Sequence, residues 1–248
     1  MKPRASVSDA FFISERGMVM KENERNPLAY EPISKLLLKF SVPTALTLIV
    51  NYLYNIVDQI FVGQKAGVVG IAATNVAFPM TTICMAAALL IGDGCAANVS
   101  LHLGRKEQEK ADHAFGNAFF LLICFDILVL VFGNIFLSDL VLLFGATDTV
   151  YASAMSYSRI ILAGLPFMIF CVSFTAIIRA DGNPKYTMKC MMIGAVINVV
   201  LDALFIMKFN MGVVGAAAAT IIGQIVSGIM CLAYIPRLKN INFSRKIF

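Results

Sequence analysis

The sequence contains no tryptophan and two histidines, and it has few charged residues for its length. Asp, Glu, Lys and Arg make up 14% of the 248 residues, whereas soluble globular domains carry about 25%. Hydrophobic residues make up 59%, more apolar surface than one soluble core can bury, so a lipid bilayer is the expected solvent. Any aromatic belt at the membrane interface would have to come from the seven tyrosines.

Motifs for common kinds of catalysis and metal binding are also missing. The six cysteines form no Cys-x-x-Cys pair, which argues against a zinc site or a redox motif. There is no nucleophile–base constellation and no phosphate loop, so we expect neither an enzyme nor a cofactor. His102 and His113 flank a basic connection and are interpreted as interfacial polar residues. The net charge of +5 does not indicate a nucleic-acid partner, because the basic residues are spread between hydrophobic segments.

Six hydrophobic segments are each long enough to cross the hydrocarbon core, which takes about 20 helical residues. They predict an all-α integral membrane protein. Short connections with turn residues separate them, including Gly63-Gln64-Lys65 after the first and Asp181-Gly182-Asn183-Pro184 before the fifth. The predicted spans are 33–62, 68–101, 112–137, 150–178, 186–207 and 213–236.

The basic residues predict the orientation. With the N-terminus inside, 17 of the 20 Lys and Arg residues fall on the inner side, as the positive-inside rule requires. We therefore expect a protein of the cell (inner) membrane with both termini cytoplasmic. The predicted organisation is a polar cytoplasmic tail over residues 1–32, a six-helix transmembrane lobe over 33–238, and a second cytoplasmic tail over 239–248.

The first span carries a polar stripe. Its five members recur at spacings of three and four residues, which places them on one helical face. Such a face cannot point to lipid and must face a protein interior or a water-filled cavity. The members are Thr44, Thr47, Asn51, Tyr54 and Asp58.

The fifth span carries a shorter stripe of the same kind. Gly194, Asn198 and Asp202 are spaced four residues apart and share one face. Depth estimates place Asp58, Asn198 and Asp202 between mid-membrane and the outer half, close enough to share one site. Two carboxyl groups in a low-dielectric cavity can take up a proton at ordinary pH and release it when hydrated. With the amide oxygen of Asn198, the same cluster could instead bind Na⁺.

Two further acids lie inside predicted spans. Asp126 is a weaker candidate for function, because its helix has no matching polar stripe. Asp93 is weaker still, since it lies near the inner end of a segment flanked by glycines.

Six segments in order resemble the multidrug and toxic compound extrusion (MATE) family over residues 31–238. Individually none is decisive, but together they make the resemblance strong. The segments are EPISKLLLKFSVP at 31–43, VDQIFVG at 57–63, Gly92 to Gly104 with the basic run after it, IRADGNP at 178–184, INVVLD at 197–202, and GVVGAA at 212–217 leading to Thr220.

The resemblance implies a fold of twelve helices in two six-helix lobes, of which this chain is similar to the N-terminal one. It implies export of organic cations and drugs against H⁺ or Na⁺. Asp58, Asn198 and Asp202 match the family's coupling site, and Thr220 matches a residue lining the same cavity. Thr175 stands where many relatives have asparagine. A second six-helix lobe, from a separate chain or a second copy, would be needed.

Two other functions stay open. One is an inactive truncated fragment or a structural membrane subunit without transport of its own. The other is a lipid-linked saccharide flippase, which is less favoured because the spans contain a stripe ending in an acid and almost no Lys or Arg.

Overall fold

The computed structural model describes residues 32–238. The predicted tails therefore lie outside the described residues, apart from Pro32. The chain divides into two compact units, 1–38 and 39–248. The described part of the first unit is the opening turn of a helix, in which the Lys35 and Leu36 amides donate to the Pro32 carbonyl. The rest of this section concerns the second unit.

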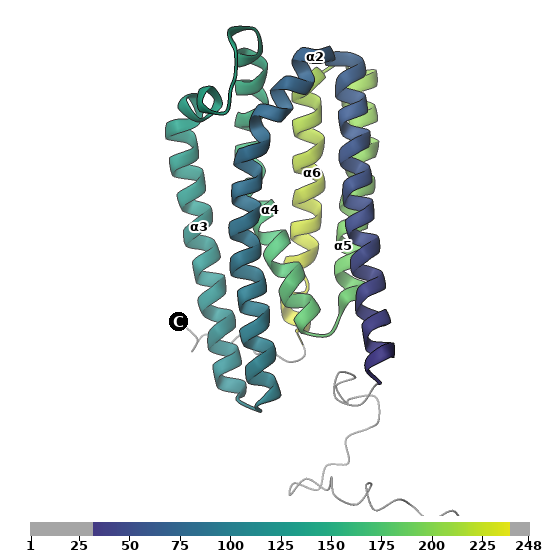
Figure 1. The fold of residues 1–248 in the computed structure, drawn as a ribbon, viewed down its shortest axis with the longest axis vertical. Helices are drawn as coiled ribbons and strands as arrows, with labels where there is room; N and C mark the ends of the chain where they lie inside the picture. Colours follow the sequence, from purple (N-terminus) through teal and green to yellow (C-terminus); the bar gives the residue numbers. More distant parts are fainter. Residues whose placement is uncertain (1–31, 239–248) are drawn as a thin grey trace, which may run out of the picture. The chain divides into compact units, whose positions relative to one another are not determined.

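The first long element, α2 (Ile33–Gly104), has 72 residues, belongs to the second unit from Lys39 onward, and turns back on itself at Gly67. Its helical rise amounts to about 108 Å, enough to cross a hydrocarbon core of about 30 Å twice. Gly67 has φ 61° and ψ −156°, a conformation open essentially only to glycine. Figure 1 shows α2 reversing direction at this point. The turn falls between the predicted spans 33–62 and 68–101, as expected, but the turn residue is Gly67, and Gly63-Gln64-Lys65 stay helical.

The remaining helices follow with short connections, and no strand occurs among residues 32–238. Five elements of this part are long and apolar enough to span a membrane, α2 being counted once. Because α2 reverses at Gly67, the unit has the six crossings that the sequence predicted. The elements are α3 (Gln108–Leu143), α4 (Asp148–Ala180), α5 (Pro184–Asp202), the π-helix η2 (Ala203–Lys208), α6 (Gly212–Leu232) and the 3₁₀ turn η3 (Ile235–Arg237).

The connection between α4 and α5 shows how local sequence sets these boundaries. Gly182 has φ 89°, which allows the chain to leave α4 in a left-handed turn. The Asn183 side chain then accepts a hydrogen bond from the Tyr186 amide at 3.2 Å. Pro184 occupies the first turn of α5. Backbone N–H groups there have no acceptor within the helix, so the missing N–H of proline costs no hydrogen bond.

Small residues let helices approach closely at two places. A Cβ atom on Gly194 of α5 would lie 2.0 Å from Ser227 Oγ of α6. A Cβ atom on Gly92 of α2 would lie 2.5 Å from Ser173 Cα of α4, and the Ser173 hydroxyl donates to the Ala88 carbonyl at 2.8 Å. These contacts fix α5 against α6 and the second arm of α2 against α4, as small residues do in membrane proteins.

Candidate functional site

The two acids of the polar stripes meet inside the unit. Asp58 comes from the first arm of α2, and Asp202 is the last residue of α5. Both residues are buried, 6% and 0% exposed, and their carboxyl groups lie close enough to influence one another. The structure thus brings together two residues that are 144 positions apart in the sequence.

The carboxyl pair has too few hydrogen-bond donors. One oxygen of each group, Oδ1 of Asp58 and Oδ1 of Asp202, is buried and accepts no hydrogen bond from the described residues. Burying two unpaired carboxylates side by side is costly. A proton shared between the carboxyl groups, or a cation held by them, would satisfy both oxygens. The site therefore suits a single positive charge that binds and leaves.

Asn198 connects this pair to α6. It lies one turn before Asp202 and is 3% exposed. With its amide oriented to satisfy both neighbours, Nδ2 donates to Asp202 Oδ2 at 3.3 Å and the oxygen accepts from the Thr220 amide at 3.2 Å. Asn198, from the stripe of the fifth span, and Thr220, from the resemblance to the family, therefore lie together. Asn198 orients one acid of the pair, Asp202.

Sequence reasoning missed two residues behind Asp58. Gln59 Nε2 lies 3.5 Å from Asp58 Oδ2, and Thr74 Oγ1 lies 3.2 Å from Gln59 Oε1. Gln59 adjoins Asp58 in the VDQIFVG segment and could have been considered. Thr74 is on the second arm of α2, and nothing in the sequence reveals the contact before the turn at Gly67 is known.

The backbone changes its hydrogen-bond pattern directly after Asp202. The π-helix η2 begins at Ala203, and the Phe209 amide donates to the Leu204 carbonyl at 3.0 Å. Single-turn π segments inside membrane or soluble helices are frequent at functional sites. Asp202 thus stands at the junction of an α-helix and a π-helix, a feature that the sequence did not predict.

A cavity of about 100 Å³ lies beside the pair, between α2, α4, α5 and α6. Four of the seven residues predicted to line a cavity do line it: Asn51, Tyr54, Gly194 and Thr220. Asn198 lines it too, so this cavity and the carboxyl pair share one residue. Sulfur-containing side chains complete much of the wall: Met85, Met168, Cys171 and Met191.

The three other residues predicted to line a cavity bond to their own helices instead. Thr44 donates to the Phe40 carbonyl and Thr47 to the Pro43 carbonyl, at 2.8 and 2.7 Å. Thr175 is 7% exposed and donates to the Val172 carbonyl at 2.7 Å.

The two weaker acids lie elsewhere. Asp126 of α3 has one buried oxygen, Oδ1, with no hydrogen bond from the described residues. Asp93 of α2 forms an ion pair with Arg179 of α4, with 3.5 Å between Oδ1 and the guanidinium. Over residues 32–238 no group of three His, Cys, Asp or Glu side chains is arranged to hold a metal ion.

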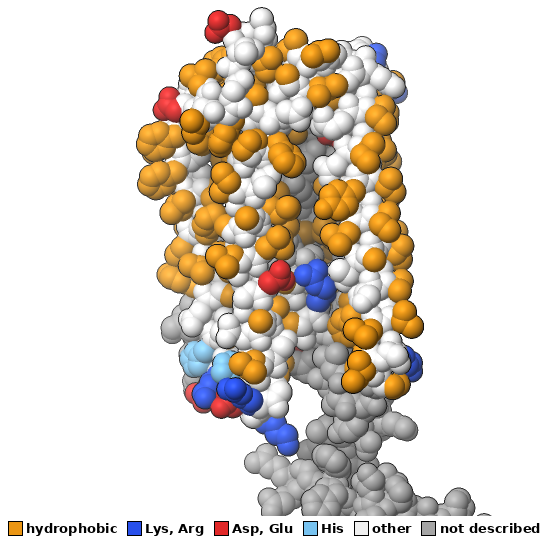
Figure 2. Space-filling view, viewed as in Figure 1, with side chains coloured by type: hydrophobic (Ala, Val, Ile, Leu, Met, Phe, Trp, Pro, Cys, Tyr) orange, Lys and Arg blue, Asp and Glu red, His pale blue; other side chains and the backbone are white. Residues whose placement is uncertain are grey.

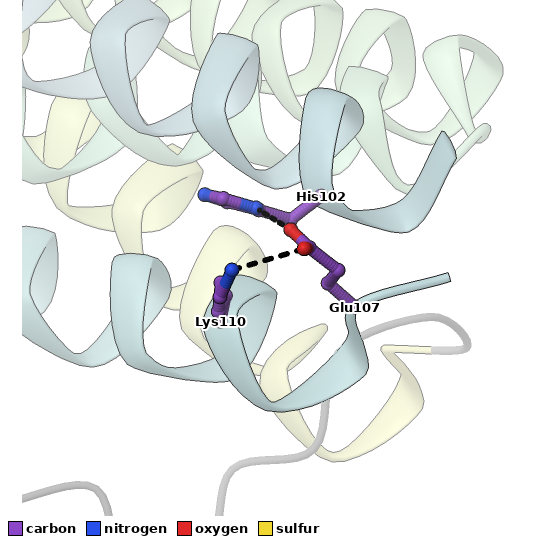
Figure 3. Close-up of polar contacts among 3 residues, drawn as sticks. All are labelled: His102, Glu107 and Lys110. Carbon is purple, nitrogen blue, oxygen red and sulfur yellow. Dashed lines mark hydrogen bonds and ion pairs between the residues drawn. The ribbon is translucent and has the colours of Figure 1, made fainter. Parts of the chain in front are cut away.

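The connection between α2 and α3 carries a separate polar cluster, drawn in Figure 3. Glu107 lies 2.8 Å from His102 Nδ1 and 2.9 Å from the Lys110 ammonium group. Both contacts lower the pKa of the Glu107 carboxyl below its ordinary value of 4.5, and the contact with Lys110 has the larger effect. His102 therefore has a local hydrogen-bond partner, whereas His113 is exposed.

Comparison with known proteins identifies the family. The MatE family model matches residues 43–204, which include Asp58, Asn198 and Asp202. The chain belongs to the MatE family. It resembles the probable multidrug resistance protein YoeA of Bacillus subtilis, with 25% identity over 81% of this chain and 44% of that protein. It also resembles the multidrug export protein MepA of Staphylococcus aureus, with 25% identity over 87% and 48% of the two chains.

Solved structures of MatE-type transporters share the fold. The chain superimposes on the MATE multidrug transporter DinF-BH with a TM-score of 0.83 and 34% identity, over 91% of this chain and 51% of that one. A MOP superfamily transporter from Pyrococcus furiosus gives a TM-score of 0.76 with 28% identity, over 86% of this chain and 49% of that one. This chain spans about half the length of the relatives it matches, as expected for one six-helix lobe of a multi-pass membrane transporter.

Proposed function

We propose that this MatE-family chain is the N-terminal half of an antiporter that exports organic cations or drugs in exchange for H⁺ or Na⁺. The observation that carries the proposal is the proximity of the buried carboxyl groups of Asp58 and Asp202. Each has an oxygen without a donor from the described residues. A site of this kind gains stability when a proton or cation arrives, and intramembrane acids commonly mark such pathways.

The roles of the residues follow from their contacts. Asp58 and Asp202 bind the coupling ion, and Asn198 orients Asp202 while its oxygen is directed to Thr220. For Na⁺, the carboxylate oxygens supply hard oxygen ligands. The Asn198 amide oxygen would join them only in the reverse orientation of the amide, in which Nδ2 donates to Thr220 Oγ1 at 3.4 Å and the oxygen faces Asp202. The substrate cavity begins at the wall that Asn198 shares, so the charge state of the pair affects a cationic compound nearby through Coulomb attraction.

The partner and the orientation belong to the same proposal. A second six-helix lobe, contributed by another chain or by a second copy, would form the other half of the cavity. A two-fold axis along the membrane normal would relate the two lobes. The chain would lie in the cell (inner) membrane with both termini in the cytoplasm, in accord with the distribution of Lys and Arg.

The test is efflux of ethidium, a fluorescent organic monocation, from vesicles that contain only this chain, under an imposed pH or Na⁺ gradient. We expect gradient-dependent efflux, its loss in Asp202→Asn, and its retention in Asp148→Asn, which removes an exposed acid from the first turn of α4. Equal gradient dependence in Asp202→Asn and the parent chain would refute the coupling role of the pair.

A binding measurement separates coupling from the need for a second lobe. Ethidium binding to the purified chain in nanodiscs should weaken when protons or Na⁺ occupy the pair, and Asp202→Asn should abolish that dependence. Folded protein that binds ethidium in this way without transporting it would be one lobe of an exporter. Folded protein that neither binds nor transports ethidium would instead be an inactive fragment or a structural subunit.

A further inference from the structure

The ion pair between Asp93 and Arg179 lies on two helices that also border the cavity. Arg179 is 3.5 Å from Asp93 Oδ1. Asp93 is eleven residues from the end of α2 at Gly104, about 17 Å along the helix. Arg179 is in the last turn of α4, so the pair joins the end of α4 to a point two to three turns before the end of α2.

The register of both helices places the pair at one end of the cavity. On α2, Asp93 follows the cavity-lining residue Met85 by eight positions, and on α4, Arg179 follows the cavity-lining residue Cys171 by eight. The second arm of α2 and α4 run in the same direction (Figure 1). Both charged residues therefore lie about 12 Å from the cavity wall toward the same side of the lobe, where α2 and α4 end.

The pair is open to its surroundings. The Asp93 side chain is 58% exposed and that of Arg179 is 33% exposed. Figure 2 shows acidic and basic side chains adjacent to one another amid the hydrophobic side chains of one face. Charged side chains avoid lipid, so this part of the surface borders water or another protein segment.

The acid is held firmly, whereas its partner is on a long side chain. Gly92, next to Asp93, packs against the Ser173 backbone, and the Ser173 hydroxyl bonds to the Ala88 carbonyl. Arg179 reaches Asp93 from the last turn of α4. A guanidinium on a flexible stem can leave and return while the carboxylate stays in place.

We propose that the Asp93 carboxylate binds the positive group of an organic monocation on its way into the cavity. When no substrate is bound, the Arg179 guanidinium pairs with that carboxylate instead. This proposal rests on the export function proposed above. Substrate and Arg179 compete for one carboxylate, so removing the acid and removing the arginine have opposite effects on cation binding. A purely structural ion pair would respond in the same direction to the loss of either partner.

The experiment is equilibrium binding of ethidium to the purified chain in nanodiscs, followed by fluorescence polarisation. We expect Asp93→Asn to weaken binding about fivefold and Arg179→Gln to strengthen it by a similar factor, the scale of a partly exposed ion pair. The double variant should bind as weakly as Asp93→Asn. Arg179→Lys, which keeps the competing charge, and Asp148→Asn, an exposed acid at the other end of α4, should bind like the parent chain.

The outcomes are distinguishable from those that test coupling. Weaker binding in both single variants, or no change in either, would overturn the proposal. Tighter binding in Arg179→Gln cannot arise from misfolding, which lowers binding. Suppose that Asp202→Asn leaves the response of ethidium binding to protons and Na⁺ intact, while the Asp93 and Arg179 variants still shift the affinity in opposite directions. The coupling role of Asp58 and Asp202 then fails, and the role of Asp93 in binding the cation stands.

Discussion

The contact between Gly92 and Ser173 predicts that one methyl group will loosen the packing of α2 on α4. An alanine Cβ at position 92 would lie 2.5 Å from Ser173 Cα and 2.8 Å from the Ser173 carbonyl oxygen. Both are backbone atoms and cannot rotate away. To reach an ordinary separation of 3.4 Å, the two helices must move apart locally by about 0.9 Å.

The magnitude follows from the cost of overpacking. Forcing an extra methyl group into a tight contact typically costs about 1–3 kcal/mol. The same displacement stretches the 2.8 Å bond from Ser173 to the Ala88 carbonyl, and loss of such a bond adds about 1 kcal/mol. We therefore expect Gly92→Ala to lower the free energy of unfolding by about 2–4 kcal/mol.

The neighbouring Gly94 provides a matched control in the same helix turn. A Cβ atom there meets nothing within 4 Å, so Gly94→Ala should be neutral or slightly stabilising through helix propensity. The assay is denaturant-induced unfolding in detergent micelles, followed by circular dichroism for the parent chain and both variants. Equal stabilities for Gly92→Ala and Gly94→Ala would show that the close approach of α2 and α4 is not as described.

Two further predictions concern the connections between helices. Gly67→Ala should destabilise the chain by about 1–3 kcal/mol. The cause is backbone strain alone, because φ is 61° while the space around the new methyl group is empty. The rate of proteolysis of the purified variant should therefore rise, and an unchanged rate would contradict the turn at Gly67. Glu107 has a lowered pKa, so its ion pairs contribute stability above pH 4.5 that is lost as the pH falls through the folded-state value. Thermal melts of Glu107→Gln and the parent chain should therefore differ at pH 7 and converge in acid, and a difference independent of pH would be the contrary result.

The sequence predicts the fold well because the signals for it are local. A backbone that crosses lipid must satisfy its hydrogen bonds within itself, so an apolar segment of about 20 residues forms a helix. The six crossings are therefore visible in the composition alone. The polar stripe is visible for a similar reason, because spacings of three and four residues define one face. Its two ends differ, however: Asn51 and Tyr54 line the cavity, whereas Thr44 and Thr47 bond to carbonyl groups of their own helix.

Several features that the sequence did not reveal depend on contacts between helices. Thr74 reaches the site only because α2 turns back at Gly67, and the turn residues at positions 63–65 indicate the wrong place. Asp93 is a weak candidate by sequence because it lies near the inner end of a segment flanked by glycines, yet it has a partner, Arg179, on α4. Pairing across helices leaves no periodic trace in either segment, so only the folded chain shows it.

The two acids of α2 have opposite kinds of environment, and the proposed antiport would use that difference. Asp58 is buried against a second carboxyl group and lacks a positive partner among the described residues, whereas Asp93 is exposed and has Arg179 within 3.5 Å. Under our proposals the first site is strained until a proton or Na⁺ arrives, and the second is satisfied until an organic cation displaces the arginine. A ligand shifts a conformational equilibrium only by its difference in affinity between the states. Exchange would then require states of the lobe that differ in their affinity for the coupling ion and for the organic cation. The Asp202→Asn and Asp93→Asn variants separate the two contributions.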